Sequence, residues 1–188
     1  IVTTDTLNIK MEVDVPSVIQ ADMYENGLIP HPYKSNIESQ LHWIPQHEWE
    51  YSLDFKAEDY ILREDVIELV FEGLDTYADV WMNGKKILHA DNMFRTYSYD
   101  VKDIIKETNN IKIKFYPFDK ERDSLIETYP LRFPEKYAVM RKAAYQNGWD
   151  WAPRYMNMGI WQPVYLKAWT RSTICSASVI TNEIHDDK

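Results

Sequence analysis

The Asn83-Gly84 pair, which separates two apolar runs, constrains the fold of this chain more than any other feature of its sequence. Residues 77–82 precede the pair and residues 85–89 follow it. Both central residues of a type I′ turn need a positive φ, which Asn and Gly adopt readily, so the pair predicts a two-residue hairpin. Because such a hairpin joins antiparallel strands, the chain is expected to contain an antiparallel sheet.

Further strands are indicated by alternating or continuous apolar patterns. Residues 49–56 alternate aromatic or apolar with polar side chains, which predicts a half-buried strand. Residues 65–71 are apolar at nearly every position, as expected of a strand in the middle of a sheet. More strands are predicted at 94–101, 111–116 and 164–168. Several short strands with frequent turns favour one all-β domain, a sandwich or a barrel.

Two stretches interrupt this pattern. In the N-terminal third, turn residues recur too often for long regular elements, and a short helix over 17–24, capped by Ser17, is predicted there. Residues 117–148 contain three prolines and mixed charge, with a helical pattern from Glu135 to Ala144. Long excursions from compact domains tend to be functional, so a site is expected where this one ends.

Charge and cysteine content exclude several classes of protein. The formal net charge of -9 argues against nucleic-acid binding, which depends on Lys and Arg to neutralise phosphates. The single Cys175 rules out an internal disulfide framework and a cysteine-based zinc site, and it is expected to be a buried thiol. No apolar run approaches the roughly 20 residues of a membrane span, so no membrane partner is expected.

The excursion ends in the run Gly148-Trp149-Asp150-Trp151, which places one carboxylate between two indoles. A pyranose has an apolar face of C–H bonds and a rim of hydroxyls, and it is held by an aromatic platform together with a charged acceptor. The run therefore predicts part of a sugar subsite. The alternative interpretation is a packed, Trp-rich corner of the core.

Other site chemistries find little support. Cleavage of a glycoside needs two carboxyl groups at a defined separation, and no pair of acids in this sequence converges on one. His31, His42 and His47 lie close in sequence but lack helical i, i+4 spacing, so no metal ligand is predicted. Asp91-Asn92 is interpreted as a turn rather than a calcium site. No phosphate loop or nucleophile elbow occurs, and no cofactor is expected.

Several short motifs are distributed over residues 12–170. They are Val15-Pro16-Ser17 with Asp22, Asn26-Gly27-Leu28-Ile29, Trp43, Trp49-Glu50-Tyr51, Phe71 to Ala78, Val80 to Gly84, Gly148 to Arg154, Gly159-Ile160-Trp161 and Pro163-Val164. Together they resemble the amino-terminal sugar-binding domain of glycoside hydrolase family 2. The segment from residue 74 to residue 84 is shared widely in that family, whereas the Trp-Asp-Trp segment resembles the β-mannosidase branch.

The resemblance implies a jelly-roll, galactose-binding-domain-like antiparallel β-sandwich with long loops and one or two short helices. This domain is expected to cover residues 1–170, and residues 171–188 to be a linker or the start of an immunoglobulin-like domain. A catalytic (β/α)8 barrel would follow in the parent enzyme. Both catalytic glutamates belong to that barrel in the family, so this chain is expected to contribute no catalytic residue.

The resemblance also implies roles for particular side chains. Trp149 and Asp150 would bind the terminal sugar of a β-mannoside or other β-glycoside, with Asn36 as a further candidate. Arg141, Trp151 and Arg154 would support the loop rather than contact the sugar.

The parent is thus expected to be a retaining exo-β-mannosidase, to which this chain supplies a loop that shapes the subsite. A β-galactosidase, a β-glucuronidase and a free-standing carbohydrate-binding module remain as alternatives. The sequence leaves the compartment open, with a periplasmic or secreted parent favoured over a cytoplasmic one.

Overall fold

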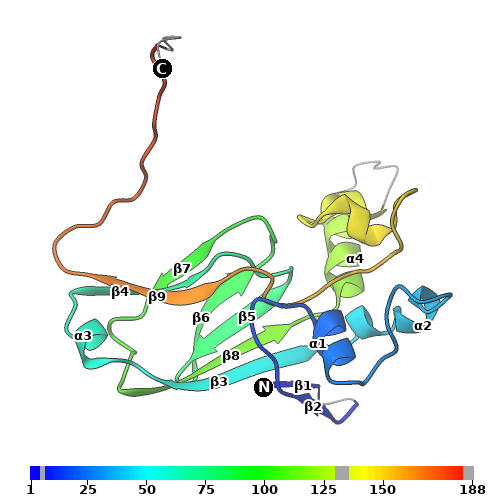
Figure 1. Ribbon diagram of the computed structural model, residues 1–188, viewed down its shortest axis with the longest axis horizontal. Helices are drawn as coiled ribbons and strands as arrows, with labels where there is room; N and C mark the ends of the chain where they lie inside the picture. The colour runs from blue at the N-terminus through cyan, green and yellow to red at the C-terminus, as the bar shows by residue number, and fades with distance from the viewer. Residues whose placement is uncertain (5–6, 130–135, 184–188) are drawn as a thin grey trace, which may run out of the picture.

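The computed structural model describes residues 1–4, 7–129 and 136–183, and its two antiparallel sheets pack face to face (Figure 1). One core of buried apolar side chains lies between them. The larger sheet has the order β2 (Ile9–Met11), β1 (Val2–Thr4), β3 (Trp49–Lys56), β8 (Thr108–Phe115), β5 (Ala78–Met82) and β6 (Lys85–Ala90). The smaller sheet has the order β7 (Tyr97–Asp100), β4 (Val66–Phe71) and β9 (Val164–Trp169). The predicted all-β sandwich is confirmed.

The hairpin predicted at Asn83-Gly84 joins β5 to β6. Met82 pairs with Lys85, so the loop contains only the two expected residues. Their φ values are 51° and 80°, both positive, as a type I′ turn requires. The Asn83 side chain also donates to the carbonyl of Ile104 at 2.8 Å, which fixes the turn to the chain before β8.

The alternating pattern predicts the inward faces well in some strands and only partly in others. In β8, Ile111, Ile113 and Phe115 are buried, as their spacing predicts. In β3, Trp49 and Tyr51 are buried, whereas Leu53 is 58% exposed and lines an open pocket of about 330 Å³ together with Val164 of β9. β4 lies between β7 and β9, which confirms the central position predicted from its continuous apolar run.

The N-terminal helix is real, but the predicted cap is wrong. Helix α1 spans Ile19–Glu25, and its N-cap is Val18, with no side-chain hydrogen bond. Ser17 instead donates its backbone N–H to the carbonyl of Ile160 at 2.8 Å, and Ile19 donates to Met158 at 2.9 Å. The helix start is therefore set by pairing with a distant segment, which supplies the acceptors that a capping side chain would otherwise provide.

The helical part of the excursion is also misplaced in the sequence prediction. Helix α4 spans Phe118–Thr128, directly after Pro117, where no helix was expected. A helix was predicted from Glu135 to Ala144, but the structure has two short 3-10 turns there, η2 (Lys136–Val139) and η3 (Ala144–Asn147). Glu135 lies outside the residues that the structure describes. The difference arises because α4 is held by packing of Phe118 against Tyr77, a contact across 41 positions of sequence that no local pattern shows.

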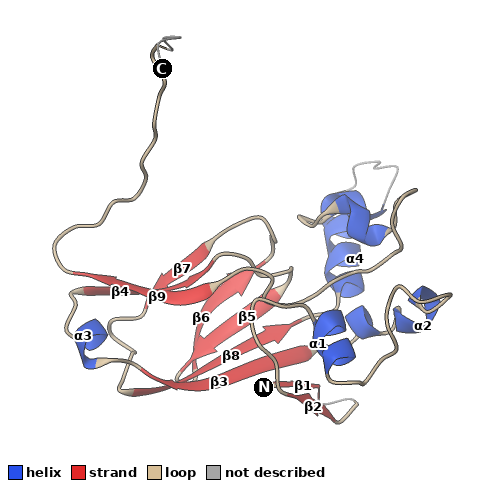
Figure 2. Cartoon of the chain, in the orientation of Figure 1, coloured by secondary structure: helices blue, strands red, loops and turns tan. Residues whose placement is uncertain are grey.

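The remaining helices are single turns. They are α2 (Glu38–Leu41), η1 (Ile44–Gln46) and α3 (Asp59–Leu62), and Figure 2 shows α2 and α3 at opposite ends of the sandwich. Helices α1, α2 and α4 lie at one end, together with the excursion. Among the residues described, no helix combines the length and apolarity needed to cross a membrane.

Residues 171–183 leave the sandwich after β9 as an extended segment without regular secondary structure. Ile174, Val179 and Ile180 are 82%, 98% and 78% exposed. Cys175 is exposed as well, so the prediction of a buried thiol is wrong. The segment that contains Cys175 does not pack on the core, so the thiol is accessible.

Candidate functional site

The Trp-Asp-Trp run forms a tight turn closed by two backbone hydrogen bonds. The Trp149 N–H donates to the Ala152 carbonyl at 3.0 Å, and the Ala152 N–H donates to the Trp149 carbonyl at 3.2 Å. Asp150 and Trp151 occupy the two central positions and are exposed, Trp151 by 69%. Trp149 is 55% exposed. The structure thus contradicts the alternative of a buried, Trp-rich corner.

Trp149 and Asp150 line a pocket of about 800 Å³, which we call the Trp149 pocket. Its other lining residues are Tyr137, Ala138, Met140, Lys142, Ala144, Asn147 and Gly148. This volume lies within the range typical of small-molecule sites. In the described part of the chain, the Asp150 carboxylate has no hydrogen-bond or ion-pair partner, so its oxygens are available to a ligand.

A buried ion pair lies behind this pocket and ties the excursion to the sandwich. Lys142 donates to the carboxylate of Asp75, just beyond β4, and the two side chains are 0% and 1% exposed. Lys142 also donates to the carbonyl of Asn157 at 2.6 Å. Gln146 donates to Asp75 at 3.1 Å and accepts from the Asn157 N–H at 3.0 Å. Each polar group of this cluster thus has a partner, as burial requires.

Burial lowers the pKa of Lys142 to about 8, although the neighbouring Asp75 carboxylate acts in the opposite direction. The cost of desolvating an ammonium group thus outweighs the attraction of its partner. Sequence reasoning missed both residues. Asp75 and Lys142 are 67 positions apart, and although Asp75 lies in the motif of residues 71–78, no local pattern shows that the two charges pair in the core.

Gly159, which lies beyond the Trp149 turn, joins the following segment to the same cluster. Its backbone forms a bridge with Asp75, with N···O distances of 2.9 and 3.0 Å. The φ of Gly159 is +151°, and a Cβ there would lie 2.8 Å from the Ser17 carbonyl oxygen and 2.9 Å from the Tyr51 hydroxyl. No other residue fits without moving the backbone, which explains the glycine in the Gly159-Ile160-Trp161 motif.

Arg154 contacts helix α2 and the excursion, and Trp151 contacts the excursion. The Arg154 backbone N–H donates to the Glu38 carboxylate at 2.7 Å, and its guanidinium donates to the Tyr137 hydroxyl at 2.8 Å. The Trp151 ring lies 5.9 Å from the Tyr145 ring. The supporting roles of both side chains at a sugar subsite stay a prediction.

The other two predicted residues lie outside the Trp149 pocket. The carbonyl of Arg141 accepts a backbone hydrogen bond from Met93 at 3.0 Å, but its exposed side chain lines a different pocket. Asn36 is exposed just before α2, where its carbonyl accepts from the Ser39 hydroxyl at 3.5 Å. The structure therefore brings Trp149 and Asp150 together and does not place Asn36 beside them.

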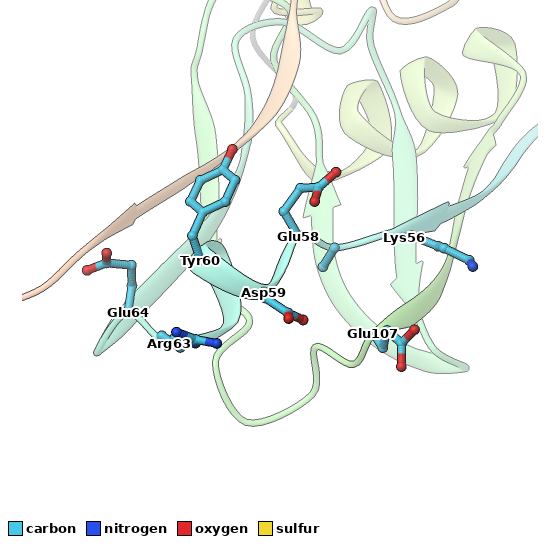
Figure 3. A pocket seen from close by; sticks show the side chains of 8 residues that line it. Lys56, Glu58, Asp59, Tyr60, Arg63, Glu64 and Glu107 are labelled. Atoms are coloured by element: carbon cyan, nitrogen blue, oxygen red, sulfur yellow. The ribbon is translucent and has the colours of Figure 1, made fainter.

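A further pocket, of about 670 Å³, surrounds α3 at the opposite end of the sandwich (Figure 3). Its lining consists mainly of charged side chains of both signs: Lys56, Glu58, Asp59, Arg63, Glu64 and Glu107, with Tyr60. Tyr60, which is 67% exposed, is the one aromatic side chain among these lining residues, so the pocket has no aromatic wall like that of the Trp149 pocket. Over the described ranges, no group of three His, Cys, Asp or Glu side chains is placed to hold a metal ion.

Comparison with known proteins agrees with this geometry. Residues 2–162 match the family model described as "Glycosyl hydrolase 2 galactose-binding domain-like". The chain is 29% identical to the β-mannosidase of Mus musculus over 86% of its own length and 20% of the relative's. It is 32% identical to β-mannosidase B of Thermothelomyces thermophilus, over 81% of this chain and 18% of that protein. The chain thus spans about a fifth of the length of these relatives.

Solved structures show the same relationship. The crystal structure of the β-D-mannosidase from Dictyoglomus thermophilum superimposes with a TM-score of 0.90 at 31% identity, covering 98% of this chain and 23% of the other. An exo-chitosanase from Amycolatopsis orientalis shares the fold, with a TM-score of 0.62 at 24% identity, over 83% of this chain and 16% of that one. The family match spans strands β1 to β8 and the Trp149 turn. The chain therefore belongs to glycoside hydrolase family 2, as an amino-terminal galactose-binding-like domain similar to that of the β-mannosidases.

Proposed function

We propose that this chain is the non-catalytic domain of a retaining exo-β-mannosidase and that its Trp149-Asp150 turn shapes the subsite for the terminal sugar. The observation that carries the proposal is the exposed Trp149 ring beside an unpartnered Asp150 carboxylate in a pocket of about 800 Å³. The indole face suits the C–H face of a pyranose, and the carboxylate accepts hydrogen bonds from its hydroxyls.

The chemistry of the pocket supports a binding role rather than a catalytic one. Among the lining residues of the Trp149 pocket, Asp150 is the single acid. Hydrolysis of a glycosidic bond normally takes two carboxyl groups, about 5 to 5.5 Å apart in retaining enzymes. The second half of the machinery would come from a downstream (β/α)8 barrel, preceded by an immunoglobulin-like domain. The share of the relatives' length that this chain leaves uncovered has room for both.

The test compares the parent enzyme, carrying this chain as its N-terminal part, with an Asp150→Ala variant on an aryl β-mannoside. We expect kcat/KM to fall by at least about 30-fold, which corresponds to about 2 kcal/mol for a lost charged hydrogen-bond partner. Glu58→Gln, in the α3 pocket, is the control and should leave kcat/KM unchanged. An unchanged kcat/KM in Asp150→Ala would reduce the domain to a structural role.

The isolated 188-residue chain should not hydrolyse the same substrate, and turnover by it would refute the requirement for a barrel.

The retaining mechanism is tested by NMR, which identifies the anomer that the parent enzyme releases. Aryl β-galactoside and β-glucuronide distinguish the two alternative sugars within the family. Tight binding of manno-oligosaccharides by the chain alone would instead indicate a free-standing carbohydrate-binding module.

A further inference from the structure

A second pocket, of about 600 Å³, lies on the other side of η2 and has no part in the proposed function. We call it the Tyr77 pocket. Its lining residues are Tyr77, His89, Asp91, Glu121, Leu125, Tyr129, Ala138, Val139 and Arg141. Ala138 lines this pocket and the Trp149 pocket, so the two are adjacent but separate.

Tyr77 contributes a buried hydroxyl that has no partner. The residue is 4% exposed, and its ring packs against Phe118 with a centroid distance of 6.3 Å. Its hydroxyl is buried and makes no hydrogen bond in the structure. Buried hydroxyls are nearly always paired, because a hydroxyl taken from water without a partner is costly. An orphaned hydroxyl on a residue that lines a pocket therefore points to a ligand.

The surroundings of Tyr77 favour a donor at this position. Burial, and after it the charges of Glu121 and Asp91, raise the pKa of Tyr77 to about 12. The phenol is protonated at neutral pH, as an ordinary tyrosine is, and can donate a hydrogen bond. The two carboxylates that act on it are acceptors that line the same pocket.

The pocket offers further groups of both kinds. Glu121, Leu125 and Tyr129 recur every four residues along α4 and its C-terminal end, so they share one face. Tyr129 is 57% exposed and provides a flat ring. Arg141 faces the pocket as a donor. Neither the Glu121 carboxylate nor the Arg141 guanidinium has a hydrogen-bond or ion-pair partner in the described ranges.

This combination selects the class of ligand. A metal ion is disfavoured because these acids form no ligand cluster among the described residues, and the Arg141 charge opposes any cation. An anion is disfavoured by Asp91 and Glu121. A neutral sugar satisfies both kinds of group, since each hydroxyl donates and accepts, and a pyranose face suits the Tyr129 ring. We propose that the Tyr77 pocket is a second carbohydrate-binding site, specific for a neutral pyranoside and independent of the Trp149 pocket.

The experiment is an NMR titration of the 188-residue chain with methyl β-D-mannopyranoside, followed through backbone amide shifts. We expect saturable shifts at Glu121, Tyr129 and His89, with a Kd on the order of millimolar. Tyr77→Phe removes only the hydroxyl and Glu121→Gln only the charge, and each should weaken binding at least about fivefold. Asp150→Asn, in the Trp149 pocket, should leave these shifts unchanged.

Two outcomes would overturn the proposal: shifts confined to residues around Trp149, or an affinity at the Tyr77 pocket that Tyr77→Phe does not change. Dispersed amide shifts of β3 and β8 confirm in each variant that the sandwich is folded. Because the proposed function is tested by turnover of the parent enzyme and this site by binding to the isolated chain, either can fail without the other.

Discussion

At the scale of single residues, the Lys142–Asp75 ion pair matters most, because it holds the excursion against the sandwich. Both side chains are fully buried, and Gln146 and Asn157 complete their hydrogen bonds. Removing one charge from such a pair leaves the other buried without compensation, which costs more than the intact pair contributes. The Trp149 turn starts only three residues after Gln146, so its position depends on this cluster.

We expect Lys142→Met to lower the free energy of unfolding by about 3–5 kcal/mol, measured by urea denaturation. The double variant Asp75→Leu with Lys142→Met should recover part of this loss, because neither charge is then left alone. If the single and double variants were equally unstable, packing rather than charge would be responsible.

The same lysine predicts a pH dependence. Burial lowers its pKa from 10.5 to about 8, so between these values the unfolded chain binds a proton that the folded chain has released. Stability must therefore rise with pH through this window. The stability difference between wild type and Lys142→Met should grow from pH 8 towards pH 10.5, when urea unfolding is repeated across the range. A constant difference would show that Lys142 titrates normally.

What sequence reasoning finds at this scale depends on distance along the chain. Trp149 and Asp150 were identifiable because the aromatic wall and the acceptor are neighbours in one run. The role of Asp75 was not, since its partners lie 67 and 71 positions away. The orphaned hydroxyl of Tyr77 was equally invisible, because a sequence does not show which buried group lacks a partner.

At the scale of elements, local signals predicted those whose geometry is fixed by their own residues. The β5–β6 hairpin follows from Asn83-Gly84, and β4 from its apolar run. Helix α4 and the start of α1 were misjudged, because packing on Tyr77 and pairing with residues 158–160 decide them. The excursion is therefore anchored by contacts of long sequence separation rather than by local propensity.

Gly159 allows a test of one such anchor. We expect Gly159→Ala to cost at least about 3 kcal/mol, because the new Cβ adds overlap with Ser17 and Tyr51 to an unfavourable φ. Gly84→Ala is the matched control, with a positive φ but nothing within 4 Å of its Cβ, and should cost about 1–2 kcal/mol. Chemical denaturation of both variants measures the contrast, and equal losses would mean that the segment shifts freely to accept the methyl group.

At the scale of the whole molecule, the number and alternation of strands were sufficient to predict an all-β sandwich or barrel, but not the order of its strands. β3 pairs with β8, and β4 pairs with β9, although each pair is separated by more than 50 residues. Such pairings depend on which apolar faces fit together after collapse, and this information is not contained in any one segment. The family resemblance supplied the jelly-roll architecture that periodicity left open.

The extended segment after β9 predicts a domain boundary near residue 170. A chain that ends at Thr170 should have a Tm within about 2 °C of the 188-residue chain in calorimetry, because the exposed side chains of residues 171–183 make few contacts. A chain that ends before Val164 also lacks β9 and should not fold, since β4 then loses one of its two neighbours. A large drop in Tm for the chain that ends at Thr170 would mean that the domain boundary lies closer to the C-terminus.

The direction of β9 also sets a requirement for whatever closes the Trp149 pocket. This strand starts beside the excursion and carries the chain over its six residues, about 20 Å, to the far end of the molecule, where the extended segment departs (Figure 1). Under the proposed function, a catalytic module tethered through that segment would begin a full strand length away from the sugar that it must reach. Such a module would have to be broad enough, or its tether long enough, to extend back along the side of the sandwich to the Trp149 pocket. The length of the connection would therefore limit which surface of the module can complete the pocket.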